Sequence, residues 1–179
     1  MKHCLLLLAL FGCFPFCSFG QFSDDFSSES LGSWLQIPSN RWNATVDNGN
    51  FVLHHCYDNS SAGRDYITSK VVVSSYENGK LTWRFRVKHG YSPSSSNGWA
   101  FILASDTDAT GLYNASQSSC LVVGVNFAGS DDLLKIWEQT SSSTGSKSVK
   151  VISSSTLNWE SSVGTSAYGY VEVVRNANG

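Results

Sequence analysis

The 179-residue sequence predicts an all-β fold in which two antiparallel sheets pack face to face as a sandwich or jelly roll. Leu81, Trp83, Phe85 and Val87 alternate with polar residues, which is the two-residue period of a half-buried strand. Other short runs rich in Val, Ile, Phe, Tyr and Trp are bounded by Gly, Ser, Asn and Asp. No stretch has a sustained helical period with helix-forming composition, so we expect only short helical turns.

The expected strands follow one another along the chain with polar turns between them. They cover residues 50–56, 66–73, 80–88, 98–104, 120–127, 133–139, 148–152 and 168–175. The hairpin signal Asn78-Gly79 predicts that 66–73 pairs with 80–88. The segments 98–104 and 120–127 are apolar at consecutive positions, which predicts strands buried on both faces.

The first 20 residues have the pattern of a secretory signal peptide. Met1-Lys2-His3 is a short positive start, residues 4–16 form an apolar run, and Ser18-Phe19-Gly20 places small residues at a cleavage site. The run is shorter than the ~20 residues of a membrane-spanning helix, and no second such run follows. We therefore expect a secreted or cell-surface protein without a membrane span after cleavage, with one domain over residues 21–179.

The end of the chain predicts an incomplete domain. Asn178-Gly179 is a turn signal directly after the strand expected at 168–175. Sandwich domains commonly run to ~200 residues or more. We therefore expect one or more final strands after residue 179, either because the chain is a fragment of a longer polypeptide or because the sequence is truncated.

Composition and charge exclude several classes of protein. Hydrophobic residues make up 41% and charged residues 15% of the chain, which excludes disorder and a coiled coil as descriptions of the whole. The 12 Lys and Arg against 14 Asp and Glu give a formal charge of -2, far from the basic balance of proteins that contact phosphates. Nucleic acid is therefore not an expected partner.

Two pairs of side chains are candidates for a cross-link or a metal site. Cys56 and Cys120 lie outside the expected signal peptide, and export to an oxidising compartment favours a disulfide between them. The alternative is a pair of inert buried thiols. Asp106 and Asp108 offer oxygen ligands to Ca²⁺, which is the one cofactor that the sequence suggests. The alternative is that Asp simply favours turns.

Several motifs together carry a family resemblance. Residues 22–26 (FSDDF), Trp34, Trp42, residues 92–97 leading into 99–106, and residues 129–134 resemble the N-terminal domain of large exported bacterial surface proteins. Those domains look like concanavalin A-like lectin/glucanase jelly rolls and often precede lamin-tail modules. The segment 97–101 is also similar to a strand of legume lectins that starts with a sugar-holding Asp, where this chain has Asn97. The resemblance implies a carbohydrate-binding role and further domains of the same longer chain.

The sequence does not favour glycoside hydrolysis. That reaction generally needs two carboxylates ~5 to 9.5 Å apart, which on a strand means acids at alternate positions. Asp106 and Asp108 are the one pair of acids two residues apart, and they fall in a polar turn. Glu172 has no such partner, and no Gly-x-Ser-x-Gly elbow occurs. The prediction leans towards a protein without catalytic residues.

One group of candidate ligand-binding residues is aromatic. Tyr91, Asn97, Trp99 and Tyr113 lie in or beside expected loops at one rim of the sandwich. Aromatic rings offer an apolar face to sugar rings, and neutral amides supply hydrogen bonds. The alternative is core packing, particularly for Trp99.

A second group is cationic. Arg84, Arg86 and Lys88 occupy alternate positions, and therefore one face, of a strand. On a concave sheet this row favours an anionic glycan, whereas the alternative is a solvated sheet face.

Two functions from different classes follow. The first is a non-catalytic carbohydrate-binding or adhesive module whose partner is a polysaccharide or a cell-surface glycan. The second is a ligand-free structural spacer in a multidomain surface protein. A glycoside hydrolase is the least favoured alternative.

Overall fold

The structure is a computed structural model that describes residues 22–58, 63–69, 71, 79–114, 118–141 and 146–176. These residues form antiparallel strands and two short helices, so the predicted all-β class is confirmed. The strands are β1 (Trp34–Ile37), β2 (Trp42–Asp47), β3 (Asn50–His55), β4 (Tyr66–Ser69), β5 (Leu81–Val87), β6 (Trp99–Ser105), β7 (Cys120–Val125), β8 (Leu133–Ser141), β9 (Lys147–Asn158) and β10 (Gly169–Arg175). The helices are α1 (Ala109–Asn114) and α2 (Trp159–Ser162).

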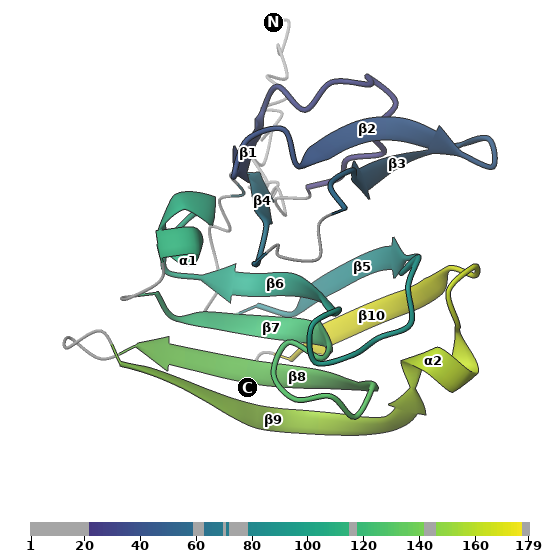
Figure 1. The fold of residues 1–179 in the computed structure, drawn as a ribbon. Coiled ribbons are helices and arrows are strands. Elements are labelled where there is room, and N and C mark those ends of the chain that lie inside the picture. Colours follow the sequence, from purple (N-terminus) through teal and green to yellow (C-terminus); the bar gives the residue numbers. More distant parts are fainter. Residues whose placement is uncertain are drawn as a thin grey trace, which may run out of the picture.

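Strands β6-β7-β8-β9 form a four-stranded antiparallel sheet in that order. Three two-stranded ladders accompany it: β5 with β10, β1 with β4, and β2 with β3. Figure 1 shows the β5–β10 ladder beside the four-stranded sheet as a second layer, with the β1–β4 and β2–β3 ladders above them. The arrangement is consistent with a β-sandwich.

The main core lies between the β5–β10 ladder and the four-stranded sheet. Trp83, Phe85 and Val87 of β5 contact a cluster that includes Val123 and Val125 of β7. Along β5 these side chains alternate with exposed polar ones, as the two-residue period predicts. The prediction of which β5 side chains face the core is therefore confirmed.

One end of the main core is closed by α2. Trp159, the first residue of α2, is 1% exposed, and its ring meets that of Trp99 edge-on at 4.8 Å. Asn158 caps this helix by accepting a hydrogen bond from the N–H of Ser161. Gly169 of β10 leaves room for the indole, because a Cβ there would lie 2.2 Å from its Cη2 atom.

A second core cluster covers the opposite face of the four-stranded sheet. It joins Val122 of β7 and Trp137 of β8 to Leu112 of α1, with Tyr66 of β4 packed against it. Strand β7 alternates between the two clusters and is almost wholly buried, which confirms the predicted burial on both sides.

The same prediction is wrong for β6. Ala100 and Phe101 are exposed, the latter to 37%. The physical reason is position: among the described strands, β6 is paired only with β7 and lies at the edge of its sheet. Leu103 belongs to the first cluster and Ile102 packs against the second. Ala100 and Phe101 stay exposed although they are apolar.

The predicted hairpin between 66–73 and 80–88 is also wrong. Strand β4 ends at Ser69 and pairs with β1, whereas β5 pairs with β10 from Leu81↔Arg175 to Val87↔Gly169. Residues 72–78, which include the first residue of the turn signal, lie outside the described residues. Alternation along a strand predicts which face is buried but not which strand is its partner.

Other boundaries differ in detail. Strand β9 runs for 12 residues from Lys147, well past the predicted 148–152, and β1 and β2 were not predicted. The predicted strand at 168–175 corresponds to β10. The signal peptide at 1–20 and the turn signal at 178–179 lie outside the described residues, so both stay predictions. No helix within the described ranges is long and apolar enough to cross a membrane.

Candidate functional site

The predicted aromatic rim is not one cluster. Tyr91 and Asn97 lie in the loop before β6, whereas Tyr113 lies on α1, which follows β6. The two groups are therefore at opposite ends of a seven-residue strand. Trp99 packs against the main core, with its ring against those of Phe85 and Trp159, so the alternative of core packing holds for it.

The loop before β6 is held together by its own polar side chains. Asn97 donates from Nδ2 to the carbonyl of Ser92 at 2.9 Å, and its Oδ1 lies 3.0 Å from Nε2 of His89. Burial lowers the pKa of His89. The Tyr91 hydroxyl donates to Asp58 at 2.9 Å, and this carboxylate raises the pKa of Tyr91. Asn97 and Tyr91 therefore have structural partners within the protein.

The cationic row has the predicted geometry but is largely compensated. Arg84 forms an ion pair with Glu172 on the neighbouring strand, and Lys88 lies 2.7 Å from Asp47. The guanidinium of Arg86 lies 4.9 Å from the centre of the Tyr168 ring. Two of the three cations thus already have a carboxylate partner, which weakens the row as a site for an anion.

Both predicted Ca²⁺ ligands accept hydrogen bonds from backbone N–H groups. Both carboxylate oxygens of Asp106 accept from the N–H of Ser119, at 2.9 and 3.0 Å. Asp108 accepts from the N–H groups of Thr110 and Gly111 at the start of α1. Across the described residues, no group of three or more His, Cys, Asp or Glu side chains could hold a metal ion.

The expected disulfide is not formed in the structure. Cys56 and Cys120 are both free thiols, and their environments differ. Cys56 is exposed just after β3, whereas Cys120 is buried in the second core cluster at the start of β7. The alternative of an inert buried thiol therefore fits Cys120 and not the exposed Cys56.

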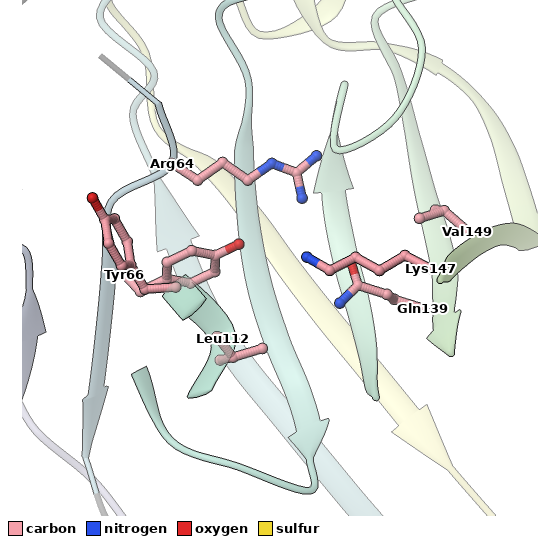
Figure 2. Close-up of a pocket in the computed structure, with 7 residues that line it drawn as sticks. Arg64, Tyr66, Leu112, Gln139, Lys147 and Val149 are labelled. Atoms are coloured by element: carbon pink, nitrogen blue, oxygen red, sulfur yellow. The ribbon is translucent and has the colours of Figure 1, made fainter. Parts of the chain in front are cut away.

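A cavity of about 310 Å³ opens on the face of the four-stranded sheet that lies away from the β5–β10 ladder. We call it the α1 cavity. Figure 2 shows Arg64 and Lys147 extending towards each other across it, with tyrosine rings and Gln139 around them. Its lining consists of two cations, two tyrosines, one amide and two apolar residues: Arg64, Lys147, Tyr66, Tyr113, Gln139, Leu112 and Val149.

Three parts of the fold meet to form these walls. Tyr66 is the first residue of β4, and Arg64 lies two residues before it. Leu112 and Tyr113 are neighbours on α1, which is linked to β4 by a 3.3 Å hydrogen bond from the N–H of Ala109 to Thr68. The sheet supplies the remaining wall, because Gln139 of β8 and Val149 of β9 are cross-strand partners on one face and Lys147 lies two residues before Val149.

The two cations of the α1 cavity differ in how firmly they are held. The Arg64 guanidinium donates to the carbonyl of Phe127 at 2.6 Å and lies 4.3 Å from the centre of its ring. The side chain of Lys147 forms no ion pair with any residue that the structure describes. Arg64 is therefore oriented in advance, whereas Lys147 keeps the freedom of a long side chain.

The charged side chains that line the α1 cavity are both cations, Arg64 and Lys147. None of its seven lining residues is acidic. Burial and the charge of Asp106 raise the pKa of Cys120, and Arg64 and Lys147 act together in the opposite direction. Gln139 is only 4% exposed and is fixed by a 3.2 Å hydrogen bond to the carbonyl of Ser118. The arrangement is chemically suited to an anionic, hydroxyl-rich ligand.

Sequence reasoning identified only Tyr113 among the residues of this cavity. Arg64, Tyr66, Gln139 and Lys147 come from separate segments, and none belongs to a recognisable motif. Only the position of Gln139, two residues after Trp137 and therefore on the same face of the strand, could have indicated a polar side chain on the inner face.

Comparisons of the chain with models of known protein families, with curated proteins and with solved structures give no match. The antiparallel sheets are compatible with the β-sandwich that the resemblance to concanavalin A-like domains predicts. The comparisons do not show that the chain belongs to that family.

Proposed function

We propose that this protein is a non-catalytic carbohydrate-binding or adhesive module and that the α1 cavity takes an acidic glycan. The observation behind the proposal is the composition of that cavity, in which two cations and two tyrosines face a common space without a carboxylate. The volume of about 310 Å³ is at the lower end of small-molecule sites and suits one or two sugar rings.

The chemistry of the two cations suggests how an acidic sugar binds. Arg64 offers a planar fork that matches a carboxylate or a sulfate, and Phe127 already fixes its orientation. Lys147 adds a mobile point charge from the other side. The rings of Tyr66 and Tyr113 supply apolar faces and hydroxyl groups for the rest of the sugar.

A binding role rather than hydrolysis follows from the missing carboxylates. Glycoside hydrolysis generally uses two Asp or Glu residues that flank the scissile bond. Among the described residues that line the α1 cavity there is neither. An exported location, proposed from residues 1–20, would bring such a site to polysaccharides and cell-surface glycans.

Calorimetric titration tests this proposal. The ligands are an oligosaccharide of uronic acids and a neutral oligosaccharide of the same length. We expect the acidic ligand to bind with an affinity that falls as salt is raised, because salt screens the attraction between charges. Lys147→Gln should weaken binding roughly tenfold or more, since a hydrogen bond to a charged group is worth about 1.5 to 3 kcal/mol.

Lys150→Gln is the matched control. Lys150 lies three residues after Lys147 on the same strand, is exposed, and pairs across the ladder with Glu138 on the opposite sheet face. It should leave the affinity unchanged. If the folded protein binds no acidic glycan, or if both lysine variants lose equal affinity, the α1 cavity is not the site. Only the first outcome, no binding at all, makes the ligand-free spacer the better description of this region.

A further inference from the structure

The outer face of the β5–β10 ladder contains an unusually exposed tyrosine. Tyr170 is 80% exposed, and it stands directly across the ladder from Arg86. Its neighbours Gly169 and Val171 are buried, so the ring is on the side away from the main core. Beside it is a hollow of about 430 Å³. Arg84, Phe85, Arg86, Tyr170, Val171 and Glu172 line this hollow.

The pairing of β5 with β10 determines which side chains are neighbours on this outer face. Alternate residues of β10 lie opposite alternate residues of β5, so that Tyr170 faces Arg86 and Glu172 faces Arg84. Arg84 and Glu172 form an ion pair across the ladder while both stay well exposed. Arg86 extends over the ring of Tyr168 at 4.9 Å. We call this set, Arg84, Arg86, Tyr168, Tyr170 and Glu172, the ladder face.

Among the described residues, Arg86 is the one cation of the ladder face without a carboxylate partner, and its guanidinium lies over the ring of Tyr168. The other charges argue against a charged ligand. Glu172 balances Arg84, and beside them Asp47 balances Lys88 at 2.7 Å. An anion that approached Arg84 would meet the carboxylate of Glu172, and a cation would meet the guanidinium. Hydroxyl groups have no such conflict, because a hydroxyl donates to a carboxylate and accepts from a guanidinium at the same time.

The shape of the ladder face suits an extended chain of sugars. The hollow runs over two paired strands and is open to solvent, unlike a pocket that encloses a single terminal group. Tyr170 supplies a flat ring on which the C–H face of a sugar can stack. We propose that the ladder face is a second carbohydrate site, which binds a neutral polysaccharide through Tyr170 and the Arg84–Glu172 pair.

The two sites are independent of each other. The main core separates the ladder face from the four-stranded sheet, and the α1 cavity is on the far side of that sheet. A ligand on the ladder face therefore does not touch Arg64 or Lys147, and both sites can be occupied together. A protein with this layout would link an acidic glycan to a neutral one.

Affinity electrophoresis in gels that contain a soluble neutral polysaccharide tests the proposal. The probes are a β-glucan, a xylan, a galactomannan and an α-mannan, each at low and at high salt. We expect at least one probe to retard the protein, with little dependence on salt because the polysaccharide is uncharged. Tyr170→Ala should weaken this retardation at least about tenfold, as for an aromatic anchor. Glu172→Gln should weaken it as well, because it removes the negative charge that pairs with Arg84 and that strengthens a hydrogen bond from a sugar hydroxyl.

The controls separate this proposal from the proposed function. Tyr91→Ala removes another exposed tyrosine, 58% exposed, that lies outside both sites, and it should leave the retardation unchanged. Lys147→Gln should also leave it unchanged while it weakens the acidic ligand. Failure of all four probes with a folded protein, or full retardation of Tyr170→Ala, would overturn the second site and leave the α1 cavity standing. Loss of neutral binding in Lys147→Gln would instead assign the sugar to the α1 cavity.

Discussion

The contact between Gly169 and Trp159 allows a quantitative test of the packing at the end of the main core. A methyl group at position 169 would lie 2.2 Å from Cη2, 2.8 Å from Cζ2 and 3.0 Å from Cζ3 of the indole. Real Cβ contacts do not approach so closely, so Gly169→Ala must displace the ring or the strand. The ring cannot move freely, because it is 1% exposed and packs against Trp99 at 4.8 Å.

The expected cost comes from two opposing effects. Overpacking a core by an added methyl group costs about 1 to 3 kcal/mol. Alanine recovers about 0.4 to 1 kcal/mol because it restricts the unfolded chain more than glycine does. A contact this close to a buried ring belongs to the upper part of the overpacking range, about 2 to 3 kcal/mol. The net destabilisation is therefore about 1 to 2.6 kcal/mol, which for a domain of this size lowers the melting temperature by roughly 2 to 10 °C.

A double-mutant cycle with Trp159→Phe identifies the cause. The three clashing atoms belong to the six-membered ring of the indole, at its outer edge, and a phenyl ring at position 159 does not reach as far. The methyl group of Gly169→Ala would fill part of the space that Trp159→Phe leaves. We expect the double variant to be about 0.5 to 3 kcal/mol more stable than the sum of the two single effects.

Chemical denaturation of the four proteins measures this coupling. Gly90→Ala is the control, since a Cβ at Gly90 meets nothing within 4 Å, and its effect should stay within about 0.5 kcal/mol. If Gly169→Ala melts with the wild type, or if the two substitutions are additive, the indole is not packed against β10 as described.

Three further predictions concern the core, a surface carboxylate and the thiols. Trp83→Ala should destabilise the fold by about 3 to 5 kcal/mol and Thr82→Ala by little, as measured by denaturation; equal small effects would contradict the register of β5. The hydrogen bond from Lys88 lowers the pKa of Asp47 most, followed by the hydrogen bond from Tyr168. The ionised carboxylate therefore stabilises the fold at pH values above the ordinary carboxyl pKa of 3.8, and this stabilisation is lost as the pH falls through the lowered pKa. The stability difference between wild type and Asp47→Asn should therefore vanish in strong acid, and a constant difference over the whole pH range would refute the linkage. Cys56 should react with a thiol reagent in the native state and Cys120 only after unfolding, because burial shields Cys120 and raises the pKa of its thiol; equal rates by mass spectrometry would contradict the free, buried thiol.

The sequence predicted local features of the fold better than its long-range pairings. The alternation around Trp83 gave the correct inward face of β5, and the continuous apolar run of β7 gave its double burial. Both properties depend on neighbours along the chain. The partner of β5 is instead a strand almost 90 residues away, at Gly169–Arg175, and no local signal specifies it.

The candidate site was less accessible to sequence reasoning for the same reason. Trp99 and Tyr113 were expected at one rim, but the whole length of β6 separates them. Arg64 and Lys147 lie more than 80 positions apart and meet only because β4 packs on the sheet that contains β9. Single residues of suitable chemistry can be proposed from a sequence, whereas their convergence depends on tertiary packing.

The placement of β4 and α1 over the four-stranded sheet has a dynamic consequence. Arg64 and Tyr66 approach the α1 cavity from the β4 side, while Gln139 and Lys147 belong to the sheet itself. Local unfolding that lifts β4 away would therefore dismantle this cavity while the β5–β10 ladder and the main core stay closed. A ligand that contacts both β4 and the sheet would oppose this local unfolding. It should therefore slow amide hydrogen exchange in β4, with no comparable protection in β10.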